Sequence, residues 1–88
     1  MENNTKKKYV VVTGAYGGMG QSTVNKLVNE GYIVFALDKV AGEAVENVFP
    51  IQVDLTNIES VKIAFEKVKN ITTNLFAIVH FAGVYKLD

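Results

Sequence analysis

The sequence predicts an α/β fold in which about four parallel strands and two main helices form a doubly wound sheet. Short, continuously apolar stretches rich in β-branched residues alternate with longer stretches of helical periodicity. That alternation is typical of parallel strands that are buried on both faces of the sheet. No proline-rich or low-complexity linker interrupts the pattern, so we expect one domain over residues 9–88, preceded by a disordered tail over residues 1–8.

The first half of the predicted unit is a strand, a glycine-rich turn and a helix. Residues 9–13, YVVVT, form a continuous apolar run that indicates a buried strand. From Gly18 the spacing becomes helical, and Gly31 stands where a helix C-cap is expected. The predicted apolar face of this helix consists of Val24, Leu27 and Val28.

A second strand and a short connection follow. Residues 32–38, YIVFALD, read as another buried strand that ends in a carboxylate, Asp38. We expect residues 39–50 to be a short connection with one helical turn around residues 43–48. A brief third strand is expected over residues 51–55, IQVDL.

The last two predicted elements are a helix and a strand. Thr56 and Glu59 have the spacing of a capping box, which indicates the start of a helix. Residues 75–83, LFAIVHFAG, are expected to form a fourth strand that runs into a glycine turn. The predicted apolar face of the helix consists of Ile58, Val61, Phe65 and Val68.

Composition excludes several classes of function. Nine basic residues, all of them lysine, balance nine acidic ones, so no net positive field favours binding to nucleic acid or to an anionic membrane. The sequence has no cysteine and one histidine, which excludes a disulfide framework, a thiolate nucleophile and a cysteine-ligated zinc site. No apolar run approaches the ~18 residues that a membrane span requires. These features fit a cytoplasmic protein.

The glycine-rich turn indicates a site for an anion. A strand that feeds a helix through such a turn aims the free N–H groups of the helix at one point. In doubly wound nucleotide folds the anion is a pyrophosphate, and an acidic residue about 20 positions later binds the adenosine ribose. Asp38 stands 24 residues after Gly14. The alternatives are a tight turn without a ligand and a solvated strand end at Asp38.

The segment TGAYGGMG resembles the T-G-x-x-x-G-x-G motif of the short-chain dehydrogenase/reductase family, through Thr13, Gly14, Gly18 and Gly20. VDLTN is similar to the D-[LV]-T segment after the third strand of that family, and HFAG lies where the family has N-N-A-G. The resemblance covers about residues 9–84. It implies part of a Rossmann-like fold, a dinucleotide cofactor, and hydride transfer between a nicotinamide and an alcohol or ketone.

The resemblance also implies the residues that contact the cofactor. The backbone of the glycine turn would hold the pyrophosphate, and Asp38 would hold the adenosine ribose. A carboxylate at that position favours NAD over NADP, although Lys39 beside it offers a partial counter-charge. The complete set of expected cofactor-binding residues is Gly14, Tyr16, Gly17, Gly18, Met19, Gly20, Asp38, Lys39, Asp54, Leu55, Phe81, Ala82 and Gly83, in which Asp54 and Leu55 would contact the adenine.

Some positions depart from the family pattern. His80 and Phe81 replace both asparagines of N-N-A-G, and we expect His80 to be a hydrogen-bonded histidine of the core. Gly17 also makes the turn fit T-G-x-x-G-x-x-G, the spacing of the extended branch of sugar-nucleotide epimerases and dehydratases. The AG ending and the short second connection favour the compact branch. For Asp54 the alternative to an adenine contact is a carboxylate that forms a turn.

The sequence lacks the catalytic pair of the family, a Tyr with a Lys four residues later, which act together with a Ser. Four residues after Tyr9, Tyr16 and Tyr32 stand Thr13, Gly20 and Ala36, and Tyr85 has no such position within the 88 residues. We therefore expect no turnover by these residues alone, and a small-molecule substrate only together with a catalytic half. The alternatives are a non-catalytic dinucleotide-binding module and a fragment.

Four strands alone leave part of the sheet uncovered. We expect one sheet edge and the side chains of Ile78 and Phe81 to lack cover. Because an uncovered sheet edge can pair with a second chain, we expect self-association into a homo-oligomer.

Overall fold

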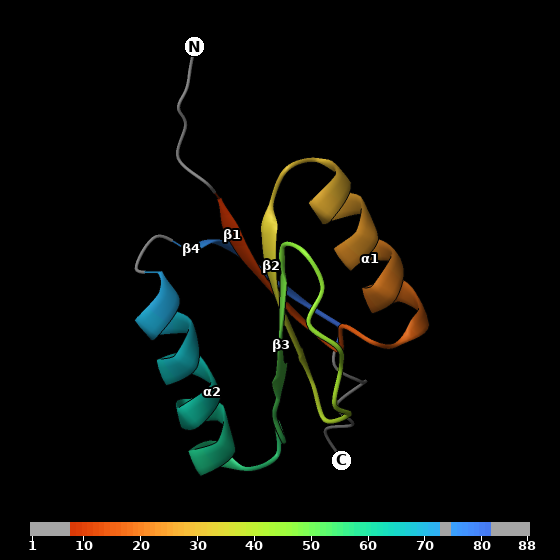
Figure 1. Ribbon diagram of the computed structural model, residues 1–88. Coiled ribbons are helices and arrows are strands. Elements are labelled where there is room, and N and C mark those ends of the chain that lie inside the picture. The colour runs from red at the N-terminus through yellow and green to blue at the C-terminus, as the bar shows by residue number, and fades with distance from the viewer. Residues whose placement is uncertain (1–7, 73–74, 82–88) are drawn as a thin grey trace.

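The computed structural model describes residues 8–72 and 75–81, which contain six elements in the order β-α-β-β-α-β. All three strand pairings are parallel, and the strand order is β3-β2-β1-β4. This arrangement confirms the predicted α/β fold with four parallel strands and two main helices (Figure 1). The elements are β1 (Tyr9–Thr13), α1 (Gly18–Asn29), β2 (Ile33–Asp38), β3 (Val48–Gln52), α2 (Ile58–Ile71) and β4 (Leu75–His80).

The two helices cover opposite faces of the sheet (Figure 1). Successive side chains of a strand point to opposite faces, so the central strands β1 and β2 contribute to two separate apolar layers. The layer toward α1 contains Val10, Val12, Ala15, Val24, Val34, Ala36 and Val48. The layer toward α2 contains Val11, Phe35, Leu37, Ile51, Val53, Ala64 and Val68. Burial on both faces explains why these two strands are continuously apolar in sequence.

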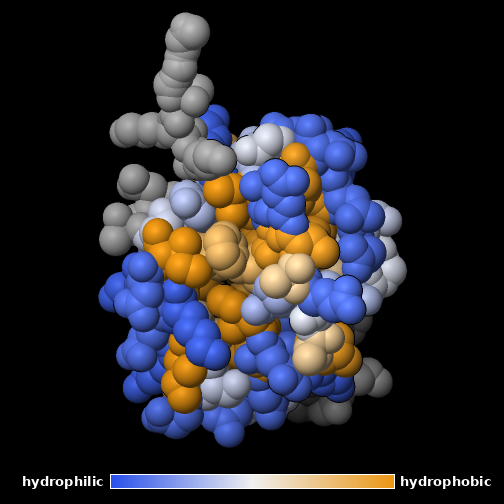
Figure 2. Space-filling view, in the orientation of Figure 1, coloured by the Kyte–Doolittle hydropathy of each residue, from blue (hydrophilic) through white to orange (hydrophobic). Residues whose placement is uncertain are grey.

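The outer strands β3 and β4 are less well covered. Figure 2 shows apolar side chains gathered over β3, between the two helices, and Phe49 of that strand is 40% exposed. On β4, Ile78 is 54% exposed, as expected, whereas Phe81 is partly buried against the layer toward α1. Pro50 has no N–H to donate, and its place on β3 is tolerated because that strand lies at the sheet edge.

The prediction for the β2–β3 connection was wrong in two respects. Residues 43–48 contain no helical turn, and β3 covers Val48–Gln52 rather than residues 51–55. A tight reversal replaces the turn of helix: Asn47 has φ +67°, and the N–H of Val48 donates to the carbonyl of Val45 at 3.0 Å. The β-branched Val48 then pairs with Val34 at the start of the ladder between β2 and β3.

The start and the apolar face of α2 also differ from expectation. Asn57, not Thr56, is the N-cap, and its Oδ1 accepts from the N–H of Ser60 at 3.1 Å. Ala64 and Val68 are buried, and Val61 and Phe65 pack partly buried beside them. Ile58, which was expected on the same face, is 74% exposed because it lies in the first turn of the helix, outside the packed layer.

The expected disordered tail, residues 1–8, lies outside the described residues apart from Lys8. The carbonyl of Lys8 accepts from the N–H of Ile33 at 2.9 Å, and its Nζ lies 4.8 Å from the centroid of the Phe76 ring. In residues 8–72 and 75–81, neither helix is long and apolar enough to cross a membrane.

The packing of α2 leads to a test with two matched substitutions. Val68→Ala should lower the free energy of unfolding by about 2 kcal/mol, because Val68 is buried at 3% exposure and the change leaves a cavity. Ile58→Ala on the same helix should change it by less than ~0.5 kcal/mol. Urea denaturation followed by circular dichroism measures both values. Equal losses for the two variants would contradict the observed face of the helix.

Candidate dinucleotide-binding site

The carboxyl ends of the strands bring most of the predicted site residues together. Thr13 pairs with Leu37 on one side and with His80 on the other, so the residues that follow these three stand next to one another. They are Gly14, Asp38 and Phe81. The N–H of Phe81 donates to the carbonyl of Thr13 at 2.9 Å, and the N–H of Val53 donates to the carbonyl of Asp38 at 2.8 Å. The second bond brings the segment before Asp54 to the same edge.

The glycine turn is built by two of its four glycines. Gly14 has φ +67°, a conformation that residues with a side chain rarely adopt. The turn closes with a hydrogen bond from the N–H of Gly17 to the carbonyl of Gly14 at 3.2 Å. A Cβ at Gly20 would lie 2.8 Å from the carbonyl carbon of Gly14 and 2.9 Å from Cα of Ala15. Gly14 and Gly20 are therefore required by the fold itself.

The other two glycines are not required by the fold. A Cβ at Gly18 would have no atom within 4 Å, and one at Gly17 would make only an ordinary contact of 3.6 Å with the carbonyl oxygen of Gly14. Neither residue has a positive φ angle. The space beside Gly18 is open, and the backbone there can be approached closely from outside the chain.

The start of α1 presents free hydrogen-bond donors. Gln21 makes the first intrahelical bond, to the carbonyl of Gly17 at 2.8 Å, so the N–H groups of Gly18, Met19 and Gly20 precede it. The N-cap of α1 is Gly17, which offers no capping side chain, and the first turn contains no acidic residue. By contrast, α2 has both a capping side chain and an acidic residue, Glu59, in its first turn. The amide groups of α1 form an arrangement that can bind an anion.

Asp38 is held in place at the end of β2. Its Oδ2 accepts from the N–H of Tyr16 at 2.9 Å, and its Oδ1 accepts from the N–H of Val40 at 3.4 Å. The first bond joins the carboxylate directly to the glycine turn. Asp38 is therefore not a freely solvated strand end, and its carboxylate has a defined position beside the helix N-terminus.

Tyr16 and Gly42 form a contact beside this carboxylate. The Tyr16 hydroxyl is buried, and no group in the described residues hydrogen-bonds to it. Burial, and secondly the negative charge of Asp38, raise the pKa of Tyr16 above its usual value. A Cβ at Gly42 would overlap the hydroxyl and ring of Tyr16. Gly42 was not among the predicted site residues, although a glycine in the short connection after the acidic Asp38 was a usable signal.

Asp54 forms a turn of its own. Its Oδ1 accepts from both the N–H of Thr56 at 2.9 Å and the Thr56 hydroxyl at 2.6 Å, and these bonds lower the pKa of Asp54, with a smaller contribution from the charge of Lys39. The turn-forming role considered for Asp54 is therefore present. Leu55 packs partly buried against the layer toward α2.

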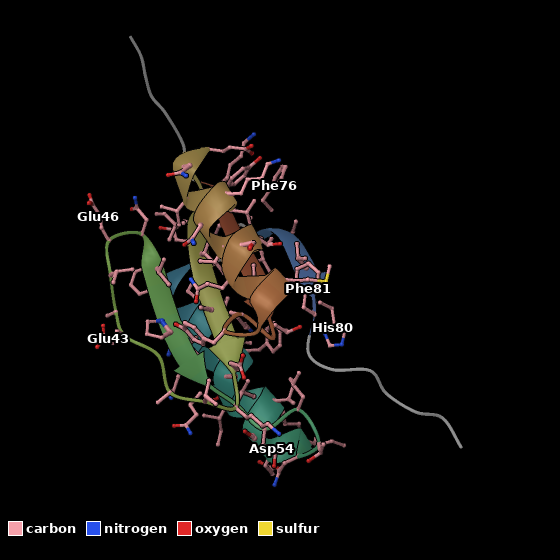
Figure 3. All side chains as sticks on the ribbon, turned by 90° about the vertical axis from the view of Figure 1, so that its right-hand side faces the viewer. Glu43, Glu46, Asp54, Phe76, His80 and Phe81 are labelled. Atoms are coloured by element: carbon pink, nitrogen blue, oxygen red, sulfur yellow. The ribbon has the colours of Figure 1, made fainter. Side chains whose placement is uncertain are left out.

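The end of β4 carries His80 and Phe81, which Figure 3 shows close to the start of α1. The Nδ1 of His80 lies 2.6 Å from the Thr13 hydroxyl, which confirms a hydrogen-bonded histidine. His80 is exposed, however, so its expected place in the core was wrong. Phe81 packs partly buried against the layer toward α1. Ala82 and Gly83 lie outside the described residues.

One surface groove lies away from the glycine turn. Its volume is about 350 Å³, its lining is largely apolar, and it includes no residue of the turn, nor Asp38 or Asp54. It lies between β3 and α2, lined by Phe49, Pro50, Ile51, Lys67, Asn70 and Ile71. In the part of the chain that the structure describes, no group of three or more His, Cys, Asp or Glu residues could hold a metal ion.

Comparison with known proteins identifies the family. The family model for short chain dehydrogenase matches residues 8–88. The chain belongs to the short-chain dehydrogenase family. It is 29% identical over 75 residues to the 3-ketodihydrosphingosine reductase of Bacteroides thetaiotaomicron. That match covers 85% of this chain and 28% of the reductase.

Solved structures of family members share the fold. Aldohexose dehydrogenase from Thermoplasma acidophilum, in ligand-free form, is 30% identical with a TM-score of 0.79, covering 92% of this chain and 31% of the dehydrogenase. A short chain dehydrogenase from Leptospira borgpetersenii with bound NAD+ is 23% identical with a TM-score of 0.78, covering 96% and 36%. The chain thus spans about a third of the length of these proteins.

Gly20 can be tested for its role in the fold by adding one methyl group. Gly20→Ala should lower the free energy of unfolding by about 1–3 kcal/mol, because the new Cβ meets backbone atoms that cannot move aside. Gly18→Ala is the matched control, with open space around the Cβ and an expected change within ~0.5 kcal/mol. Chemical denaturation of both variants measures the difference. A Gly20→Ala protein as stable as the wild type would refute the close packing.

The turn at Asp54 gives a prediction for its titration. Thr56→Val removes the hydroxyl donor and should raise the pKa of Asp54 toward its ordinary value of 3.8. Because the folded-state pKa is lowered, the stabilisation is present above the ordinary pKa and is lost as the pH falls through the folded-state value. NMR titration of the carboxyl carbon measures the change. Thr23→Val on α1 is the control and should leave the pKa of Asp54 unchanged.

Proposed function

We propose that this chain forms the adenosine-binding part of an NAD(P)-dependent short-chain oxidoreductase, which transfers hydride between a nicotinamide and an alcohol or ketone. The proposal extends what the family assignment and the fold establish, because the chain spans only part of its relatives. It concerns the carboxyl edge of β1 and β2 and the start of α1.

The observation that carries the proposal is that the fold does not require glycine at positions 17 and 18. Gly14 and Gly20 have internal reasons to be glycine, but Gly18 has none, since a Cβ there would meet no atom of the described residues within 4 Å. The N–H of Gly18 is also one of the three N–H groups at the start of α1 that make no intrahelical hydrogen bond. A phosphate group that approaches the backbone would need both the open space and the donors.

The residues present fit a dinucleotide in distinct roles. The N–H groups of Gly18, Met19 and Gly20 would bind the pyrophosphate, with the positive end of the α1 dipole behind them. The fixed carboxylate of Asp38 would accept hydrogen bonds from the ribose hydroxyls. When bound, the nicotinamide supplies or accepts the hydride, and the role of these 88 residues is to bind and orient the other end of the cofactor.

We further propose that NAD is preferred over NADP. The Asp38 carboxylate would repel a 2′-phosphate and accept from a free 2′-hydroxyl. The charge of Lys39, the adjacent cation, helps to lower the pKa of Asp54, and the negative charge of Asp54 partly offsets the positive potential that Lys39 offers to a phosphate. The Leptospira dehydrogenase, which shares this fold, has bound NAD+, and this fits the proposed class of cofactor.

Catalysis would need groups outside these residues. The sequence contains no Tyr with a Lys four positions later, so we propose that residues 1–88 do not perform hydride transfer alone. The carbonyl or alcohol substrate, and the Ser, Tyr and Lys that would act on it, would belong to a catalytic part equivalent to the remaining two thirds of the relatives.

Calorimetric titration with NADH tests the site at Gly18. The wild type should bind NADH saturably and NADPH more weakly, whereas Gly18→Ala should lose at least about tenfold in NADH affinity because its methyl group occupies the phosphate position. The melting temperature of the variant should stay near that of the wild type, since the methyl group meets no protein atom. Unchanged NADH binding by Gly18→Ala, or no binding by the folded wild type, would refute the proposal.

A further inference from the structure

The β2–β3 connection has an unusual support, the side chain of Tyr16. Residues 39–47 contain no helix, so no helical side chains from this segment cover β2 and β3 on the face toward α1. The Tyr16 ring instead packs against the apolar layer on that face, which includes Val34, Ala36 and Val48. The connection passes directly over the ring at Gly42, where a side chain would overlap the phenol. The aromatic ring thus fills space between the glycine turn and the connection.

The same residue also holds the carboxylate. The Tyr16 N–H donates to Asp38 Oδ2 at 2.9 Å, while the Val40 N–H, on the far side of Asp38 in sequence, donates to Oδ1 at 3.4 Å. Both carboxylate oxygens are therefore engaged, one by the turn and one by the connection. Movement of the connection away from the turn would break the bond from Val40 and leave the carboxylate held by the Tyr16 N–H alone. The Tyr16 ring contacts the connection at Gly42.

The connection is anchored at its other points as well. The carbonyl of Lys39 accepts from Nε2 of Gln52 at 3.0 Å, and the carbonyl of Asp38 accepts from the N–H of Val53. These bonds fix the connection to the end of β3, on one side of Asp38. On the other side, toward the turn, its packing contact is with the ring of Tyr16 at Gly42. The ring of Tyr16 is therefore the contact that holds the connection on the side of the glycine turn, next to the carboxylate.

We propose that Tyr16 determines the specificity of the adenosine end of the site. With its ring under Gly42, the connection and Asp38 keep the position that suits a ribose with a free 2′-hydroxyl, and the carboxylate is kept from turning away from a 2′-phosphate. The inference rests on the dinucleotide site proposed above. It goes beyond that site because it assigns the discrimination to an apolar contact as well as to the charge of Asp38.

The proposed discrimination against a 2′-phosphate depends on the restricted movement of the β2–β3 connection. A phosphate next to a carboxylate is tolerated only if the carboxylate can turn away or a cation can approach, and both need freedom in the connection. The ring packed at Gly42 removes that freedom. Its loss would leave the charge of Asp38 in place but would allow the segment that carries Asp38, Lys39 and Val40 to rearrange around the extra phosphate.

The test compares ADP-ribose with 2′-phospho-ADP-ribose, two probes that contain the adenosine end but no nicotinamide. Calorimetric titrations give the ratio of their affinities for each variant. Tyr16→Ala keeps the N–H that binds Asp38 and removes the ring, so its preference for ADP-ribose should fall by about tenfold. Gly42→Ala displaces the ring from the other side and should lower the ratio in the same direction.

Two controls separate this role from a general effect on stability. Tyr16→Phe keeps the ring and removes a hydroxyl that has no partner in the described residues, so it should retain the wild-type ratio. Tyr32→Ala removes a partly buried tyrosine from the same apolar layer, where it contacts the Phe76 ring at 5.5 Å and not the glycine turn, and should leave the ratio unchanged. If Tyr16→Ala does not fold, Gly42→Ala and Tyr16→Phe still decide the question.

The outcomes are distinct. A ratio that falls in Tyr16→Ala and Gly42→Ala, and persists in Tyr16→Phe and Tyr32→Ala, supports the proposal. Equal loss of affinity for both probes in Tyr16→Ala would show a purely structural role and overturn it, as would an unchanged ratio in a folded Gly42→Ala protein. No binding of either probe by the folded wild type would refute the dinucleotide site itself, and this inference with it.

Discussion

The close approach of Gly20 to the backbone of Gly14 is the constraint on which the rest of the structure depends. It sets the start of α1 against the end of β1, within contact distance of the backbone of Gly14 and Ala15. From that point α1 can lie along one face of the sheet and bury Val24 against the central strands. The same contact fixes the direction in which the first amides of α1 point. The contact between Gly20 and Gly14 therefore determines both how α1 packs on the sheet and where the N–H groups of the candidate site point.

The two strands that bury both faces were predicted within one residue of their observed bounds, whereas the edge strand β3 and the connection before it were misplaced. β1 and β2 are continuously apolar because both of their faces are covered, and this pattern leaves little doubt about the type of element. β3 lies at the edge, half exposed and interrupted by Pro50, so its sequence carries a weaker signal. The reversal at Asn47 depends on a left-handed conformation that no periodicity reveals.

The candidate site shows the same division. Glycines and a terminal carboxylate can be identified from spacing, because a backbone conformation or a charge is a property of the residue itself. The contact between Tyr16 and Gly42 joins residues 26 positions apart and depends on the path of an irregular connection. Likewise, the choice of Asn57 over Thr56 as the N-cap depends on Asp54, which binds both donors of Thr56 and so removes that residue from the helix start.

The backbone N–H groups at the start of α2 have internal hydrogen-bond and charge partners, whereas, in the part of the chain that the structure describes, those at the start of α1 do not. This difference links the fold to the candidate site. In α2 the amide of Ser60 is satisfied by a side chain of the same chain, and an acidic residue in the first turn complements the dipole. In α1 the N-cap is glycine and no acidic residue is present, so a comparable internal partner is missing from the described residues. A helix with a glycine N-cap is less stable than one with a Ser, Thr, Asp or Asn cap by only about a few tenths of a kcal/mol. The binding of an anion by the same N–H groups would offset this loss of stability. The open space beside Gly18 is where such a ligand would reach them.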